Sequence, residues 1–86
     1  MPEIARFYGI IIKLFFGDHP PPHFHAIYGR DQIQISISPI TILRGSLPRR
    51  AESMVFEWAA LHQQELMDNW DRLNDDQSPQ KIEPLK

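Results

Sequence analysis

The side chains best suited to chemistry lie in one stretch, residues 17–25, which read GDHPPPHFH. This stretch holds three of the four histidines of the chain and three of its eight prolines. On a strand, His23 and His25 would share one face, with ~6–7 Å between their Cα atoms. Because histidine titrates near neutrality, such a pair can act as acid and base. It can also ligate a metal ion, with Asp18 or His19 as a third ligand.

Three uses of residues 17–25 stay open from the sequence. As a recognition element the stretch would be stiff, because its prolines fix φ and remove three backbone donors. As the site of a metal-independent ribonuclease it would use His23 and His25 as acid and base, with Arg49 or Arg50 stabilising the phosphate transition state. As a metal site it would draw on four ligands: Asp18, His19, His23 and His25.

The ligand count weakens the metal hypothesis, and we expect no metal and no cofactor. A zinc site needs about four ligands including any water. The chain has no cysteine, so a thiolate site and a disulfide framework are excluded. His62 is the one histidine outside the stretch, and Asp31, Glu57 and Glu65 are distant further ligands. We therefore expect a binding protein rather than an enzyme.

A pair of arginines offers a second site for an anion. Arg49 and Arg50 fall at the start of a predicted helix, where guanidinium groups and the helix N-terminus could hold phosphate or RNA. Four more basic residues could extend this patch on the sheet side: Arg6, Lys13, Arg30 and Arg44. The net charge of −2 gives nucleic-acid binding little support.

The first half of the chain reads as strands. Residues 10–16 are almost unbroken in apolarity, which predicts a central strand buried on both faces. Residues 32–38 alternate isoleucine with polar side chains at period two, which predicts a strand with one face in the core. Residues 4–8, 23–28 and 40–43 are further short extended segments. We expect a small, mostly antiparallel sheet of about four strands within residues 3–45.

The second half predicts a helical segment within residues 47–75. Residues 48–74 would span ~40 Å as one straight helix, whereas a seven-residue strand spans only ~23 Å. The helix must therefore break, most plausibly at residues 61–64, or overhang the sheet. An overhanging end would need a partner for its apolar face, formed by Leu66, Trp70 and Leu73. The tail, residues 76–86, could dock on the sheet or on a partner, or be disordered.

Several segments together resemble one known family of small bacterial proteins, called domain of unknown function 4160. They are residues 2–10, the proline–histidine stretch 18–25, residues 57–62 with 65–66 and 69–70, and residues 81–85. The family has no established activity, so the resemblance gives no catalytic residues. Its genes often lie beside a second small gene, as in toxin–antitoxin pairs. The resemblance therefore implies a protein that works with a partner.

The sequence as a whole predicts one α+β domain over residues 1–86, a sheet followed by one long or broken C-terminal helix. No apolar run approaches the ~20 residues of a membrane helix, and we expect a cytoplasmic protein. Residues 1–51 carry a net charge of +3 and residues 52–86 a net charge of −5. This asymmetry suits association with a charged partner or with itself. The leading hypothesis is a binding or regulatory protein of a toxin–antitoxin-like pair. Its contact residues would be Asp18, His19, His23, His25, Arg50, Leu66, Trp70 and Leu73.

Overall fold

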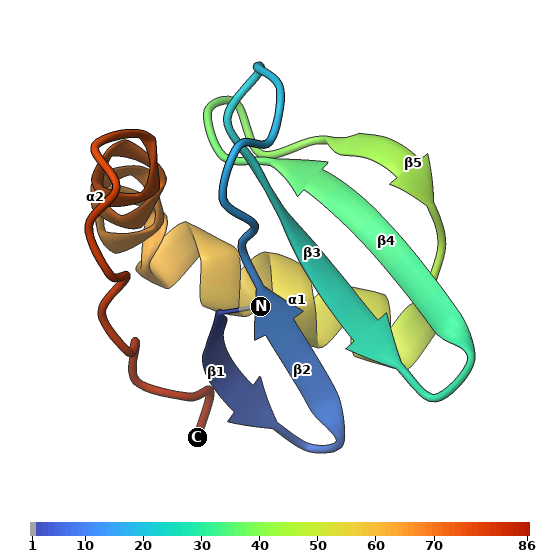
Figure 1. Ribbon diagram of the computed structural model, residues 1–86. Helices are drawn as coiled ribbons and strands as arrows, with labels where there is room; N and C mark the ends of the chain where they lie inside the picture. The colour runs from blue at the N-terminus through green and yellow to red at the C-terminus, as the bar shows by residue number, and fades with distance from the viewer. Residues whose placement is uncertain (1) are drawn as a thin grey trace.

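The computed structural model describes residues 2–86 and shows five strands followed by two helices. The strands form one antiparallel sheet in the order β1-β2-β3-β4-β5 (Figure 1). The elements are β1 (Glu3–Phe7), β2 (Ile10–Lys13), β3 (His23–Tyr28), β4 (Asp31–Ser36), β5 (Ile42–Gly45), α1 (Arg49–Leu61) and α2 (Gln63–Asn74). The predicted α+β class is confirmed. The expected count of about four strands is corrected to five, because β1 pairs with β2 as a separate strand.

Helix α1 crosses one face of the sheet, and that face forms the core (Figure 1). Alternate residues of the strands point towards it and are at most 1% exposed: Ile10, Ile12, Phe24, Ala26, Ile33 and Ile35. The period-two pattern of β4 thus has the predicted role. The prediction that β2 is buried on both faces is wrong, since Ile11 and Lys13 are only half-buried on the face away from α1.

Trp58 of α1 is the centre of the core. Its side chain is fully buried, and its ring lies 5.4 Å from that of Phe7 and 6.0 Å from that of Phe24, measured between centroids. Its indole Nε1–H donates to the carbonyl oxygen of Glu83 at 2.8 Å. One residue therefore joins the sheet, the helix and the C-terminal tail.

The helical half breaks at His62, so of the two outcomes left open by the sequence, a break at residues 61–64 is the one observed. Neither proline nor glycine marks the position. Instead, the Gln63 side chain donates to the carbonyl oxygen of Ile37 at 2.7 Å, which fixes the start of α2 against the end of the sheet. Among residues 2–86, no helix has both the length and the apolar character needed to cross a membrane.

The break also changes the role expected for the apolar face of α2. Leu66, Trp70 and Leu73 are 0%, 6% and 4% exposed, all within the core of this chain. The predicted partner surface on these three residues is therefore corrected, because the chain changes direction at His62 and α2 packs its apolar face into the core (Figure 1).

The C-terminal tail docks on its own domain. The Asn69 side chain is 2% exposed, and its amide both donates to Gln80 and accepts from it, each at 2.8 Å. The backbone N–H of Ile82 donates to the carbonyl oxygen of Ile4 at 2.8 Å. Of the three fates left open for the tail, docking on the sheet is the one observed.

Gly45, at the end of β5, supports a first prediction about stability. Its φ is +83°, and a Cβ at this position would clash with the backbone oxygen of Gln32. We expect Gly45→Ala to lower the free energy of unfolding by about 3 kcal/mol, from left-handed backbone strain and overpacking together. Urea unfolding followed by circular dichroism measures this loss.

Gly17 provides the matched control. Its φ is +73°, but no atom lies within 4 Å of the added Cβ. Gly17→Ala should therefore cost only the backbone strain, about 1 kcal/mol. Equal losses for the two variants would contradict the close approach of β4 and β5 at Gly45.

Candidate metal centre

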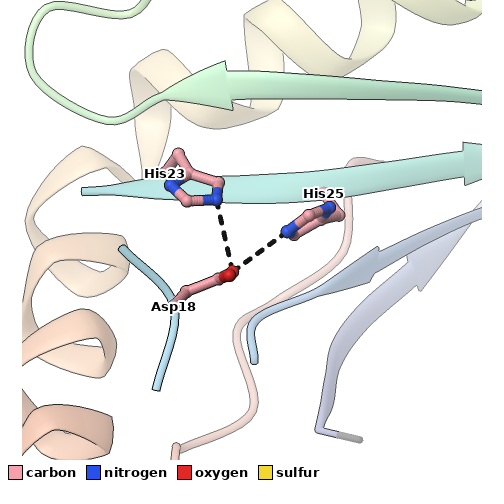
Figure 2. A group of neighbouring side chains, drawn as sticks. All are labelled: Asp18, His23 and His25. Atoms are coloured by element: carbon pink, nitrogen blue, oxygen red, sulfur yellow. Dashed lines mark hydrogen bonds and ion pairs between the residues drawn. The ribbon is translucent and has the colours of Figure 1, made fainter. Parts of the chain in front are cut away.

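The proline–histidine stretch lies on the face of the sheet opposite α1. Phe24 packs against Trp58 on the helix side, so its strand neighbours His23 and His25 point the other way. The loop between β2 and β3 then folds Asp18 over the two imidazoles (Figure 2). The sheet presents the histidines, and the loop supplies the carboxylate.

Three potential ligand atoms meet at this point. Asp18 Oδ2 lies 3.2 Å from His23 Nε2 and 3.1 Å from His25 Nε2, and all three atoms lie within 4.8 Å of one another. With metal–ligand bonds of ~2.0–2.1 Å, neighbouring ligand atoms are about 3.0 Å apart in an octahedron and about 3.4 Å apart in a tetrahedron. The spacing around Asp18 Oδ2 therefore matches the edges of a metal coordination shell.

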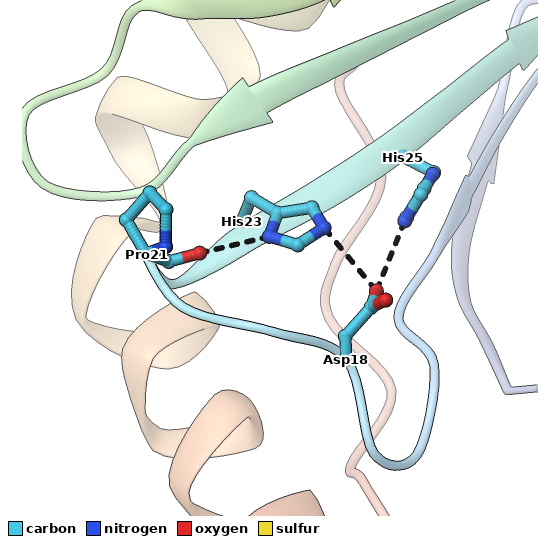
Figure 3. Close-up of polar contacts among 4 residues, drawn as sticks. All are labelled: Asp18, Pro21, His23 and His25. Atoms are coloured by element: carbon cyan, nitrogen blue, oxygen red, sulfur yellow. Dashed lines mark hydrogen bonds and ion pairs between the residues drawn. The ribbon is translucent and has the colours of Figure 1, made fainter.

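The hydrogen bond of His23 to Pro21 orients its ring so that Nε2 faces Asp18 (Figure 3). Its Nδ1–H donates to the carbonyl oxygen of Pro21 at 2.8 Å, an atom that can only accept. In the neutral ring, Nε2 is then a lone pair directed at the carboxylate of Asp18. Two lone-pair atoms 3.2 Å apart repel unless a proton or a cation lies between them. Metal-ligating histidines commonly donate their second N–H to a backbone carbonyl in this way.

His25 lies in a more apolar environment. It is 9% exposed, and its ring meets the ring of Phe15 edge-on at 4.4 Å between centroids. Burial lowers the pKa of His25, outweighing the hydrogen bond and charge of Asp18, which raise it. The neutral imidazole that results is the form that binds metals.

Trp70 of α2 forms one wall of the cluster. Its ring centroid lies 5.4 Å from that of His23, and His23 itself is only 7% exposed. The sequence placed Trp70 at a partner surface, whereas the structure places it against a ligand candidate. No local signal could have shown this, because the contact joins residues 47 positions apart.

The other predicted site residues lie outside the cluster. His19 is exposed beside it and contributes no atom to the group of three. His62 pairs with Glu65, with 2.6 Å between Nδ1 and Oε1. Arg49 and Arg50 are exposed at the start of α1. The structure thus brings together three of the four residues considered as metal ligands.

A cleft of about 340 Å³ opens beside the cluster. It is lined by Asp18, His19, Pro20, Pro21, His23, Gln34, Leu43 and Arg44. Its arginine is Arg44 of β5, not Arg49 or Arg50, which the sequence had placed near phosphate. A larger cleft of about 630 Å³ lies between α1 and the tail, away from these three side chains. We therefore take the smaller cleft as the candidate site, because two of the three converging side chains, Asp18 and His23, line it.

Comparison with known proteins gives one match. The family model described as Domain of unknown function (DUF4160) matches residues 9–71. No curated protein and no solved structure matches the chain. The matched segment contains β2 to β5, the loop with Asp18 and most of the helical half. The cluster and its cleft therefore lie within the matched domain.

Proposed function

Given that the chain belongs to the DUF4160 family, whose function is unknown, we propose that it binds a divalent transition-metal ion through Asp18, His23 and His25. The observation that carries this proposal is the orientation of His23. Its Nδ1–H donates to Pro21, so its Nε2 faces a carboxylate oxygen of Asp18 at 3.2 Å. In the neutral ring Nε2 is a lone pair, and a metal ion between the two atoms would remove their repulsion and be bound by three ligands.

The ligand set indicates the kind of ion and site. Two imidazoles and one carboxylate suit zinc, iron or nickel better than magnesium or calcium, which prefer oxygen ligands. Three protein ligands leave at least one coordination position for water or substrate, as in catalytic rather than structural zinc sites. The cleft beside Asp18 and His23 gives access to that position.

Elemental analysis of the untagged protein tests the proposal directly. We expect about one zinc, nickel or iron per chain, and after chelation a rise in melting temperature when Zn²⁺ is added. An ion at 100 times its dissociation constant stabilises a folded protein by about 2.7 kcal/mol if the unfolded chain does not bind it. Protein that lacks stoichiometric metal and shows no thermal response to Zn²⁺ or Ni²⁺ would refute the proposal.

A second candidate function is binding to a small partner protein, as expected for a toxin–antitoxin-like pair. It is favoured by β5, an edge strand whose four residues are all exposed. Ile42 is 45% exposed and Leu43 is 44% exposed, and edge strands readily pair with another chain. The partner would thus add to the sheet at β5 instead of covering α2.

The cytoplasmic location expected from the sequence stays a prediction.

Size-exclusion chromatography with light scattering tests this second candidate. The protein is run alone and mixed with the product of the neighbouring gene. We expect a complex, or a self-associated form, that Ile42→Lys abolishes and Leu61→Lys retains. Leu61 is 67% exposed at the end of α1 and is the matched control. Two results would contradict binding at β5. One is a wild-type protein that stays monomeric and forms no complex with the product of the neighbouring gene, and the other is an equal loss of the complex in both variants.

A further inference from the structure

A basic side chain, that of Arg44, lies at the cleft that Asp18 and His23 also line. Residues paired across antiparallel strands share one face of a sheet. His25 pairs with Gln34, and Gln34 pairs with Arg44. Arg44 therefore lies on the same face as His25, two strands away, or about 10 Å across the sheet. Its side chain lines the same cleft as Asp18 and His23.

Resting on the metal-binding function above, we propose that this cleft binds a phosphate ester. One phosphate oxygen occupies the open coordination position of the metal, and the others accept hydrogen bonds from Arg44 and from the amide of Gln34. Arginine suits this role because its planar fork binds phosphate oxygens in pairs.

The charges around the cleft favour an anion. Asp18 and Arg44 are the charged side chains among its lining residues, and the metal would neutralise Asp18. Within residues 2–86, Arg44 takes part in no ion pair, so its donors are available. On the other side of His25, Lys13 continues the cross-strand row. The acidic neighbour of Lys13 is Glu3, whose carboxylate is bound by Arg6 at 2.7 Å.

The volume of the cleft and the groups that line it limit the class of ligand further. At about 340 Å³, the cleft is at the small end of the ~300–1,000 Å³ typical of ligand pockets, which suits one phosphate group with a small substituent. A phosphate monoester presents three unesterified oxygens and a diester presents two. Such an ester can therefore ligate the metal through one oxygen and accept hydrogen bonds from Arg44 through another.

Isothermal titration calorimetry with the zinc-loaded protein tests this proposal. The probes are phenyl phosphate, diphenyl phosphate and, for comparison, benzoate. We expect Arg44→Gln to weaken binding of the phosphate probe at least tenfold. Arg49→Gln, which removes the same charge from an exposed position outside the cleft, should change it less than twofold. If phenyl phosphate binds and its binding depends on Arg44, the ligand is a phosphate monoester. If diphenyl phosphate binds in this way, the ligand is a phosphate diester.

Zinc affinity, measured for every variant, separates the two proposals. Normal zinc binding with no binding of either phosphate probe would overturn the phosphate proposal and leave the metal centre intact. Equal phosphate affinity in Arg44→Gln and the wild type, or benzoate bound as tightly as the phosphates, would also overturn it. Failure of the wild-type protein to bind zinc would overturn both proposals.

Discussion

Replacing Asp18 by asparagine, or either His23 or His25 by alanine, is expected to lower the affinity for Zn²⁺ by more than about 100-fold. Loss of a group that merely orients a ligand already costs 10–100-fold, and each of these changes removes a ligand itself. The three ligand atoms lie within 4.8 Å of one another, so no single loss leaves the shell intact. Competition with a zinc-binding dye measures the three affinities.

Two other histidines are the controls for this series. His19 lies in the same loop but outside the group of three, and His62 pairs with Glu65 at the helix break. His19→Ala and His62→Ala should keep wild-type zinc affinity within about threefold, because neither supplies a ligand in the proposed shell. If His19→Ala lowered the zinc affinity as much as His25→Ala, the site would lie in the exposed loop and the assignment would be contradicted.

The largest effect on stability is expected from Trp58→Ala, at about 4 kcal/mol. Removing a fully buried tryptophan leaves a cavity and typically costs 3–5 kcal/mol. Trp58 is 0% exposed, and its loss also leaves the Glu83 carbonyl without its indole donor. Because small domains are stable by only about 5–15 kcal/mol, this variant should be close to unfolding in water. Chemical unfolding at 25 °C measures the loss.

Trp58→Phe separates the contribution of ring packing to stability from that of the hydrogen bond to Glu83, and Phe16→Ala is the control at an exposed aromatic residue. Trp58→Phe keeps an aromatic ring against Phe7 and Phe24 but loses the bond to Glu83, so it should cost about 1–3 kcal/mol. Phe16 is 53% exposed, and Phe16→Ala should cost less than about 0.5 kcal/mol. If Trp58→Ala were as mild as Phe16→Ala, the tryptophan would not be the centre of the core.

The sequence was sufficient to predict those features that depend on local pattern. Alternating isoleucines predicted β4, and the mismatch between helix and strand lengths predicted either an overhang or a break at residues 61–64, where His62 lies. The stretch of prolines and histidines was selected as the candidate site, and three of its side chains do lie close together in the structure. In each case a short segment contains the whole physical argument, so no distant contact was needed.

The position of Asp18 could not be predicted in the same way. Strand geometry places His23 and His25 on one face, but it does not say where a loop carboxylate seven residues earlier will lie. The ligand count therefore disfavoured a metal site, whereas the folded loop brings Asp18 Oδ2 to 3.1 Å from His25. The orientation of His23 by the Pro21 carbonyl is likewise a property of the folded loop.

Long-range packing also determines where α2 lies and which arginine lines the cleft. The break alone did not reveal that Trp70 would pack on His23, since that depends on contacts such as Gln63 with Ile37. Arg44 had been grouped with the other basic residues of the sheet half. Only strand register, which joins it through Gln34 to His25, selects it over Arg49.

The proposed metal centre is tested most directly by a crystal structure of the untagged, zinc-loaded protein, with anomalous diffraction recorded at the zinc edge. We predict one strong peak per chain, about 2.0–2.2 Å from Asp18 Oδ2, His23 Nε2 and His25 Nε2. His23 should retain its Nδ1–H bond to Pro21, and the remaining coordination position should face the cleft with Arg44. An anomalous map without a peak at this cluster, or with zinc bound elsewhere, would contradict the assignment.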